Sequence, residues 1–317
     1  MSVQIVIQES SNGDCIWVRF GKDKKYNIVI DSGPGVFAGK FRQMIKQINS
    51  NDETVDLLIL THIDDDHING FRKSINSIEG KDIKRIWLNG DPKQYYLNQT
   101  HSAKNVGGLV KDIRKKQIEI VTPILGGTTE KIGDSYLTVL TPTYDDMINT
   151  SKTIEDFTKH SKYSKYSLNI DDINVIDKYY PDKSPTNKAS ISFILSYLDK
   201  NIAFLGDAHA EDICNGLIKY WNKGSIDMVK LSHHGSKHNT SCELLALMEC
   251  DEFIITKKSP IHKETISRIV RNREIAKVYC NYDWWTSTKF FTKQDIDKYL
   301  STGKLDISVI DRNGILI

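Results

Sequence analysis

Four side chains that can bind a divalent metal ion lie close together in one short segment of the chain. His62, Asp64, Asp66 and His67 all fall within the run Thr-His-Ile-Asp-Asp-Asp-His that starts at Thr61. Neutral imidazoles and carboxylates suit zinc or manganese, and a cation is the usual partner that makes such a cluster of like charges tolerable. On an extended loop, side chains two residues apart point the same way, so the segment could surround one or two ions. The alternative is a solvated acidic loop with two incidental histidines.

Further acidic and histidine side chains occur downstream, each after a segment that is typical of a strand: Asp207, His233, His234 and His262. Open α/β sheets gather their functional sites at the ends of strands. A single histidine after a strand is usually an ordinary polar residue, but several such groups at successive strand ends are expected to lie on one rim of a sheet. These residues are therefore predicted to join the first cluster in one metal site.

The elements that would position these residues alternate between strands and helices. Val55–Leu60 is a short apolar run typical of a buried strand, and it ends where the His/Asp segment begins. Ser190–Leu198 and Ile202–Leu205 predict a hairpin, while Ile118–Ile124 and Tyr136–Leu140 predict two strands around the Gly-Gly turn between them. Helical spacing of apolar residues between such strands completes the pattern, which predicts a layered α/β protein.

The chain is predicted to form a single domain, residues 1–317, with two additions. From about residue 144 to 186 the apolar periodicity decays, and the segment is rich in Lys, Ser, Asp, Asn and Tyr. It is too long for an ordinary connection, so we expect an inserted loop or lid there. Residues from about 281 to 317 are expected to form a C-terminal extension. No internal repeat and no clean linker divides the chain in two.

Composition indicates a globular protein of the cytoplasm. The chain has 317 residues, 39% of them hydrophobic, and no apolar run approaches the ~20 residues that a membrane span needs. Its first residues alternate like a strand and lack the features of a signal peptide. The five cysteines are scattered without any Cys-x-x-Cys pair, which argues against a disulfide framework and a thiolate zinc site. With 43 basic and 41 acidic residues the net charge is +2, so a polyanionic substrate would have to be held locally.

The motifs together resemble the metallo-β-lactamase superfamily. The order His62-x-Asp64-x-Asp66-His67, then Gly206-Asp207, then a late histidine follows the superfamily pattern, with aspartate in place of the usual second histidine of the first motif. Further segments are similar to the hydrolase domain of the competence protein ComEC and its stand-alone relatives: Gly13-Asp14, Val29-Ile-Asp31-Ser-Gly33, Asn187-Lys-Ala-Ser190 and Leu231-Ser-His-His-Gly-Ser236. The resemblance covers about residues 1 to 280, in motifs rather than in continuous similarity. It implies an α/β fold, an αββα sandwich of two stacked mixed sheets flanked by helices.

The resemblance also implies which residues hold the metal. By position, His62 and Asp64 would bind one ion, Asp66 and His67 would bind a second, and Asp207 would bridge them. The expected cofactor is one or two divalent metal ions, Zn²⁺ or Mn²⁺, and oxygen-rich ligation moves the expectation from zinc towards manganese. A bound cation of this kind lowers the pKa of water towards ~7, so a strong nucleophile is available at neutral pH.

The remaining ligand is left open between His262 and the adjacent pair His233 and His234. The family's last ligand is expected on His262, which leaves His233 or His234 to contact the substrate; the alternative is that one of those two is itself the ligand. Asn187, a weak ligand, stands where the superfamily has a further histidine, so the first ion could bind weakly or not at all. The residues expected to take part in catalysis are Asp66, His233, His234 and Ser236. Of these, His234 is expected to donate a proton to the leaving group or to hold a phosphate oxygen.

The predicted function is that of a metal-dependent hydrolase, a phosphodiesterase or nuclease that acts on nucleic acid or a nucleotide. Two kinds of side chain support this substrate, lysines that border the motifs and tyrosines in the insertion: Lys188, Lys230, Lys237, Tyr163, Tyr166, Tyr179 and Tyr180. Such side chains can neutralise and stack on a single strand, although tyrosines in a polar loop can equally serve packing. Two alternatives stay open. One is hydrolysis of a small phosphoester or lactone, and the other is a non-catalytic binding protein that retains the fold.

Overall fold

The apolar segments form two mixed β-sheets in the computed structural model, which describes residues 2–89, 101–149 and 166–317. The first sheet has the strand order β15-β1-β2-β3-β4-β5-β6 and changes from antiparallel to parallel at β3. Its strands are β1 (Gln4–Ile7), β2 (Ile16–Phe20), β3 (Tyr26–Ile30), β4 (Leu57–Leu60), β5 (Arg85–Leu88), β6 (Glu119–Val121) and β15 (Ile315–Leu316).

The second sheet has the strand order β14-β13-β12-β11-β10-β9-β8-β7, parallel from β14 to β10 and antiparallel beyond. Its strands are β7 (Thr129–Ile132), β8 (Ser135–Thr141), β9 (Ser192–Tyr197), β10 (Lys200–Phe204), β11 (Met228–Lys230), β12 (Glu252–Ile255), β13 (Ala276–Cys280) and β14 (Leu305–Val309). The predicted hairpin is present as β9 and β10. The sheet therefore brings the carboxyl ends of several parallel strands to one edge.

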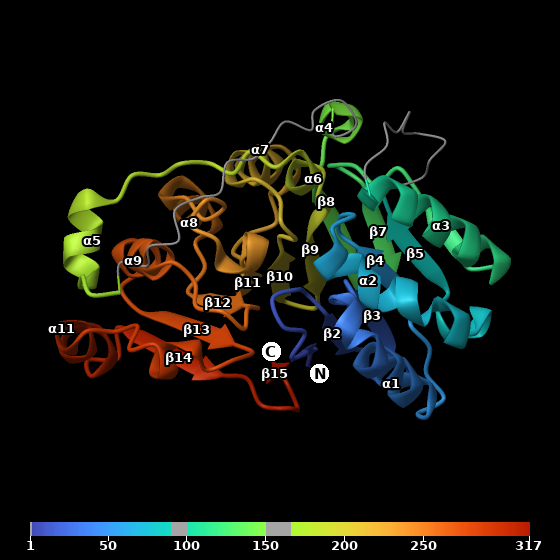
Figure 1. Ribbon diagram of the computed structural model, residues 1–317, viewed down its shortest axis with the longest axis horizontal. Coiled ribbons are helices and arrows are strands. Elements are labelled where there is room, and N and C mark those ends of the chain that lie inside the picture. The colour runs from blue at the N-terminus through green and yellow to red at the C-terminus, as the bar shows by residue number, and fades with distance from the viewer. Residues whose placement is uncertain (1, 90–100, 150–165) are drawn as a thin grey trace.

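Helices cover the outer face of each sheet (Figure 1). The first sheet carries α1 (Ala38–Asn49), α2 (Asp65–Ser74) and α3 (His101–Lys115), and the second carries α7 (Ala210–Tyr220), α8 (Cys242–Met248) and α9 (Lys263–Asn272). A third apolar cluster lies between the two sheets. Strand β4 explains the layering, because Leu58 and Leu60 join the cluster under the helices while Leu57 and Ile59 face the other sheet. The predicted sandwich of two sheets flanked by helices is confirmed.

The segment predicted as an insertion contains three short helices in its described parts. These are α4 (Tyr144–Asn149), α5 (Ile170–Ile176) and α6 (Pro185–Lys188), and residues 150–165 lie outside the described residues. Directly after α5, the carboxylate of Asp177 forms an ion pair with the buried guanidinium of Arg268 in α9. The part of the segment that leads back to the second sheet is therefore fastened to its helices.

The C-terminal part contributes to both sheets. After α10 (Trp284–Ser287) and α11 (Lys293–Asp295), β14 extends the second sheet and β15 pairs with β1 of the first. Val3 and Ile317 exchange backbone hydrogen bonds of 2.9 and 3.0 Å, so the two ends meet in Figure 1. Among the described residues, no helix combines the length and apolar character that crossing a bilayer requires.

Two strands that the sequence predicts on either side of the Gly-Gly turn belong to different sheets. The strand expected at Ile118–Ile124 appears as the shorter β6 of the first sheet, whereas the strand expected at Tyr136–Leu140 is β8 of the second sheet. The chain turns at the two glycines as expected and crosses there from one sheet to the other, where β8 pairs with β7. Local turn chemistry predicts that a chain bends and does not decide which partner it meets afterwards.

Candidate metal centre

The His/Asp segment leaves the end of β4, and its second half is helical. His62 and Asp64 lie in the short connection after β4, whereas Asp66 and His67 belong to the first turn of α2, which begins at Asp65. The extended geometry expected for the whole segment is therefore wrong beyond Asp64. Carboxylates are stabilised near the free N–H groups and the positive dipole end of a helix, which explains why an acidic run starts a helix here.

Asp207 lies at the centre of the converging side chains, after strand β10. Its Oδ2 atom is 3.5 Å from Nε2 of His67 and 3.7 Å from Nε2 of His234. The same oxygen is 3.8 Å from Nε2 of His233 and 3.9 Å from Nε2 of His62. Residues that the sequence places after separate strands thus meet around one carboxylate.

Two further carboxylates each reach part of this cluster. Asp64 Oδ2 lies 3.6 Å from Nε2 of His62. Asp66 Oδ2 lies 3.9 Å from Nε2 of His67 and 3.7 Å from Nε2 of His234. Asp64 with His62 thus forms one part of the cluster around Asp207, and Asp66 with His67 and His234 forms the other. This arrangement is suited to two neighbouring cations.

Several atoms at this centre are buried without a hydrogen-bond partner among the described residues. They are Nε2 of His62, His67 and His234, and Oδ1 of Asp207. Buried polar atoms are normally paired, and leaving one unpaired costs about 1–3 kcal/mol. Imidazole nitrogens and carboxylate oxygens are the donors that zinc and manganese accept. The residues of the cluster therefore fit a divalent metal.

The electrostatics of the cluster favour positive charge. Burial alone would raise the pKa of the Asp207 carboxyl, but the imidazoles of His67 and His234 outweigh it and hold that pKa well below its usual range. Burial would likewise lower the pKa of His67, yet Asp207, Asp31 and Asp66 raise it well above 6.5. A divalent cation satisfies the same electrostatic demand.

Asp31, buried directly after β3, positions two of the imidazoles. Its Oδ2 atom is 2.8 Å from Nδ1 of His67 and accepts a hydrogen bond from the Thr61 hydroxyl at 2.8 Å. That hydroxyl lies 3.1 Å from Nδ1 of His62. A carboxylate can only accept, so a neutral His67 carries its proton on Nδ1 and turns the lone pair of Nε2 towards Asp207.

Asp14 holds His234 in the same way. Its Oδ1 atom lies 3.0 Å from Nδ1 of His234 and accepts a hydrogen bond from the Thr256 hydroxyl. The other carboxylate oxygen pairs with the buried ammonium group of Lys230. Burial would raise the pKa of Asp14, but Lys230 and His234 outweigh it and lower that pKa, which keeps the carboxylate ionised and able to accept.

Asn187 is engaged with a carboxylate rather than with the centre. Its Nδ2 atom donates to Asp182 Oδ2 at 2.7 Å and lies 3.2 Å from Nδ1 of His233. The amide nitrogen of Asn187 is therefore held by Asp182.

His262 and Ser236 also lie outside the cluster. His262 directly precedes α9, its ring centroid is 6.2 Å from that of His238, and no group of potential ligands within the described ranges includes it. Burial lowers the pKa of His262 to about 4. The Ser236 hydroxyl accepts a hydrogen bond from the backbone N–H of His238 at 3.2 Å and so stabilises its own turn. The structure does not bring these two predicted residues to Asp207.

The lysines that the sequence associates with the substrate are all neutralised by ion pairs. The pairs are Lys188 with Asp212, Lys230 with Asp14, and Lys237 with Glu264. Lys257, after β12, forms no ion pair with any residue that the structure describes. Burial lowers its pKa, although Asp207 and Asp66 act in the opposite direction, so its ammonium lies within electrostatic range of the centre.

Sequence reasoning missed the roles of the supporting carboxylates. Asp14 and Asp31 entered only as parts of family motifs, and Asp182 was not singled out. Asp31 could have been found, because like Asp207 it ends an apolar strand. Asp14 precedes a strand and Asp182 lies in the segment of decaying periodicity, so no local pattern distinguishes them. Lys257 follows a strand end as well, but lysine at such a position is common.

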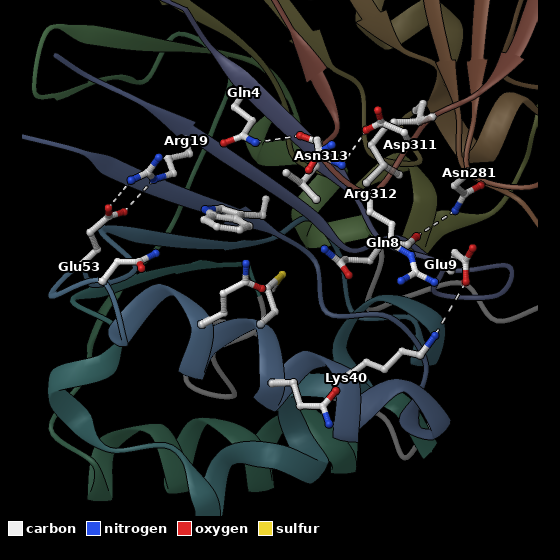
Figure 2. Close-up of a pocket in the computed structure, with 18 residues that line it drawn as sticks. Gln4, Gln8, Glu9, Arg19, Lys40, Glu53, Asn281, Asp311, Arg312 and Asn313 are labelled. Atoms are coloured by element: carbon white, nitrogen blue, oxygen red, sulfur yellow. Dashed lines mark hydrogen bonds and ion pairs between the residues drawn. The ribbon is translucent and has the colours of Figure 1, made fainter.

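A separate cavity of about 910 Å³ lies beside α1, β1 and β2 and the C-terminal residues 310–313 (Figure 2). Four of its charged side chains form two ion pairs, Arg19 with Glu53 and Lys40 with Glu9. None of the residues around Asp207 lines it. The cavity is therefore not part of the candidate metal centre.

The N-terminal part of the chain is similar to a known family. Residues 11–88 match the family model described as "Metallo-beta-lactamase superfamily". The match supports this superfamily for the chain. It spans β2 to β5 and includes the His/Asp segment, whereas Asp207 and the adjacent histidines lie beyond it. The matched part therefore contributes four residues, His62, Asp64, Asp66 and His67, to the candidate metal site.

Solved structures with detectable similarity share little sequence with this chain. The metallo-beta-lactamase fold protein YhfI from Bacillus subtilis is 10% identical with a TM-score of 0.46, covering 100% of this chain and 98% of its own. Zn²⁺-bound PqqB from Methylobacterium extorquens is 11% identical with a TM-score of 0.42, covering 95% and 86%. A diphosphatase from the PhnP family is 11% identical with a TM-score of 0.43, covering 96% and 83%. A search of curated proteins finds no match.

Proposed function

We propose that this protein is a metal-dependent hydrolase that cleaves phosphodiester bonds in nucleic acid or a nucleotide. The observation that carries the proposal is the set of buried, unpaired ligand atoms that converge on Asp207. Three separate elements, β4 with α2, β10 and β11, contribute to that set. A binding protein that had lost its chemistry would have no reason to keep several buried polar atoms without partners, because each lowers its stability.

The proposed ligands form two sets that share Asp207: His62 and Asp64 for one ion, and Asp66, His67 and His234 for the other. We assign the last ligand to His234 and not to His262, because Nε2 of His234 is 3.7 Å from both neighbouring carboxylates whereas His262 lies beside His238. Both nitrogens of the His234 ring are then engaged. His234 is therefore not free to act as the proton donor that the sequence suggested.

Zinc or manganese bound there would activate water and neutralise charge on a phosphoryl oxygen. Two carboxylates of the chain orient the proposed histidine ligands for this chemistry. Asp31 and Asp14 keep the protons of His67 and His234 on Nδ1, so that each Nε2 is available as a ligand. Lys257, within electrostatic range of the centre, offers a cation to an anionic substrate, which favours a phosphodiester over a neutral lactone.

The tyrosines contribute less to substrate binding than the sequence suggested. The Tyr166 hydroxyl donates to the backbone oxygen of Ile261, and the Tyr179 hydroxyl donates to that of His238, both at 2.8 Å. Tyr180 is 62% exposed and offers a ring for stacking on a base. Tyr163 lies outside the described residues. We therefore propose recognition mainly through the metal centre and Lys257.

The proposal is tested by hydrolysis assays on metal-free protein to which Mn²⁺ or Zn²⁺ is added. The substrates are single-stranded DNA, double-stranded DNA, RNA and bis-p-nitrophenyl phosphate. We expect metal-dependent cleavage of at least one polynucleotide, and Asp66→Asn is expected to reduce it by at least about 100-fold because it removes a ligand. Asp65→Asn is the matched control, since it removes the exposed neighbouring carboxylate of the same segment.

The outcomes separate the alternatives. Cleavage of bis-p-nitrophenyl phosphate without cleavage of any polynucleotide would favour a small phosphoester as the substrate. Metal binding without turnover of either kind of phosphodiester would contradict the proposed reaction. Equal activity of the Asp66→Asn and Asp65→Asn variants would contradict the proposed site.

A further inference from the structure

The first of the two proposed ions has three ligands, His62, Asp64 and the shared Asp207. The amide nitrogen of Asn187 is bound to Asp182. The Asp64 side chain is 35% exposed, and its Oδ2 atom also accepts a hydrogen bond from the Thr186 hydroxyl at 3.2 Å. Zinc is usually four-coordinate, so this ion has room for one further donor.

His233 is placed to supply that donor. Its Nε2 atom lies 3.8 Å from Asp207 Oδ2, the oxygen that Nε2 of His62 approaches at 3.9 Å. Metal–ligand bonds of about 2.0–2.2 Å separate two ligand atoms of one ion by roughly 3–4.4 Å. Nε2 of His233 is therefore at a distance from Asp207 Oδ2 at which both atoms can bind the same cation.

The other nitrogen of the His233 ring is held by a carboxylate. Asp182 Oδ2 lies 3.3 Å from Nδ1 of His233, and Asn239 Oδ1 lies 3.2 Å from the same atom. Asp182 is itself fixed, because it accepts hydrogen bonds from Asn187, Asn239 and the backbone N–H of Ser184. A proton on Nδ1 leaves the lone pair of Nε2 facing Asp207. Asp182 thus orients the ring of His233 in the way that Asp31 orients the ring of His67.

The backbone of the His-His turn is strained in a way that serves both rings. His233 has φ 48° and ψ 51°, and His234 has φ 55° and ψ 28°, so two successive non-glycine residues adopt the left-handed conformation. Left-handed backbone is unfavourable for such residues and persists where the surroundings enforce it. The His233 N–H donates to Gly206 O at 3.0 Å, and the Ser236 N–H donates to His233 O at 2.9 Å. The turn lets two adjacent side chains approach the same carboxylate.

We infer that His233, oriented by Asp182, joins His62, Asp64 and the shared Asp207 as the fourth side-chain ligand of the first metal ion. The inference rests on the proposed metal centre and adds to it. His62, Asp64, His233 and the shared Asp207 then form one ligand set. Asp182 is a positioning residue that acts through His233. The end of the inserted segment is therefore coupled to the metal.

The test measures metal binding, not turnover. Metal-free wild-type protein, His233→Asn and Asp182→Asn are titrated with Zn²⁺ in competition with a chromogenic chelator, and bound zinc is counted by elemental analysis. Asparagine is chosen at position 233 because it tolerates the left-handed backbone of this residue. His238→Ala is the control, a histidine of the same segment whose Nδ1 is 2.7 Å from the backbone oxygen of Tyr180.

We expect wild-type protein to bind two ions and His233→Asn to lose one of them, with the second ion bound as before. Asp182→Asn is expected to weaken the same ion by about 10- to 100-fold, the usual effect of removing the partner of a histidine ligand. The inference is overturned if His233→Asn keeps the wild-type number and affinity of ions, or if both ions weaken equally. If wild-type protein binds two ions as expected but cleaves no phosphodiester, only the proposed reaction fails.

Discussion

Replacing Asp31 by asparagine tests how the candidate ligands are oriented. The buried carboxylate is 2.8 Å from Nδ1 of His67 and accepts hydrogen bonds of 2.8 Å from the backbone N–H and the hydroxyl of Thr61. An asparagine of almost the same shape has one oxygen and one NH₂ group, so it cannot accept at all of these positions. The asparagine side chain can take one of two orientations, and each is expected to lower either the metal affinity or the free energy of unfolding.

In the first arrangement the new NH₂ group faces His67. The ring then accepts at Nδ1 and carries its proton on Nε2, the atom that would bind the metal. Returning that proton to Nδ1 sets two N–H groups against each other and loses a hydrogen bond to a charged group, at about 1.5–3 kcal/mol. Since about 1.4 kcal/mol corresponds to a factor of ten, metal affinity is expected to fall roughly 10- to 100-fold.

In the second arrangement the NH₂ group faces the backbone N–H of Thr61. Two buried donors then lack acceptors, which lowers the free energy of unfolding by about 1–3 kcal/mol. His67 keeps its acceptor, so metal affinity falls less. The change therefore has to appear either in metal binding or in stability.

The assay combines three measurements on the Asp31→Asn variant. Zinc affinity is determined by chelator competition, the free energy of unfolding by urea denaturation of metal-free protein, and the position of the His67 proton by ¹⁵N NMR of the imidazole. Asp65→Asn serves as the control, because it removes an exposed carboxylate from the same region. A variant with both wild-type zinc affinity and wild-type stability would refute the reasoning about ring orientation.

Two further predictions concern packing and pH. Gly13→Ala is expected to weaken zinc binding and to lower the free energy of unfolding by roughly 1–3 kcal/mol, because a Cβ there would lie 2.0 Å from the backbone oxygen of Asp66. Zinc titration and urea denaturation check this, with Gly39→Ala, where a Cβ meets nothing within 4 Å, as the control. The third prediction concerns His262, whose pKa is about 4 in the folded protein. Between about pH 6.5 and 4 only the unfolded chain takes up a proton at this residue, so the free energy of unfolding decreases by at most about 3 kcal/mol as the pH is lowered through that range. His262→Asn is expected to reduce this decrease. Urea denaturation at several pH values measures it, and an unchanged pH profile, or loss of bound zinc in this variant, would contradict the placement of His262 away from the metal.

Local sequence patterns predicted most of the elements that carry the centre. The apolar run before Thr61 is the buried strand β4, and the expected hairpin is present as β9 and β10. These segments are rich in apolar residues and follow one another closely, so their own side chains decide their structure. Strands β7 and β15 escaped prediction because one is polar and the other contains only two residues. Their existence depends on the neighbouring strands that pair with them.

The amino-acid sequence by itself determined the chemistry available to this protein. It places imidazoles and carboxylates after apolar strands, and strands of a layered α/β fold deliver their ends to one edge, so a metal centre built from His62, His67 and Asp207 follows from local pattern and fold class. Only the tertiary structure brings His234 close to these residues. His234 is held by Asp14, 220 positions away, and His262 is not held at all in that place. The reason is physical: a histidine ligand almost always donates its other ring N–H to a partner that fixes the position of the proton, and the fold can bring that partner from any distance along the chain.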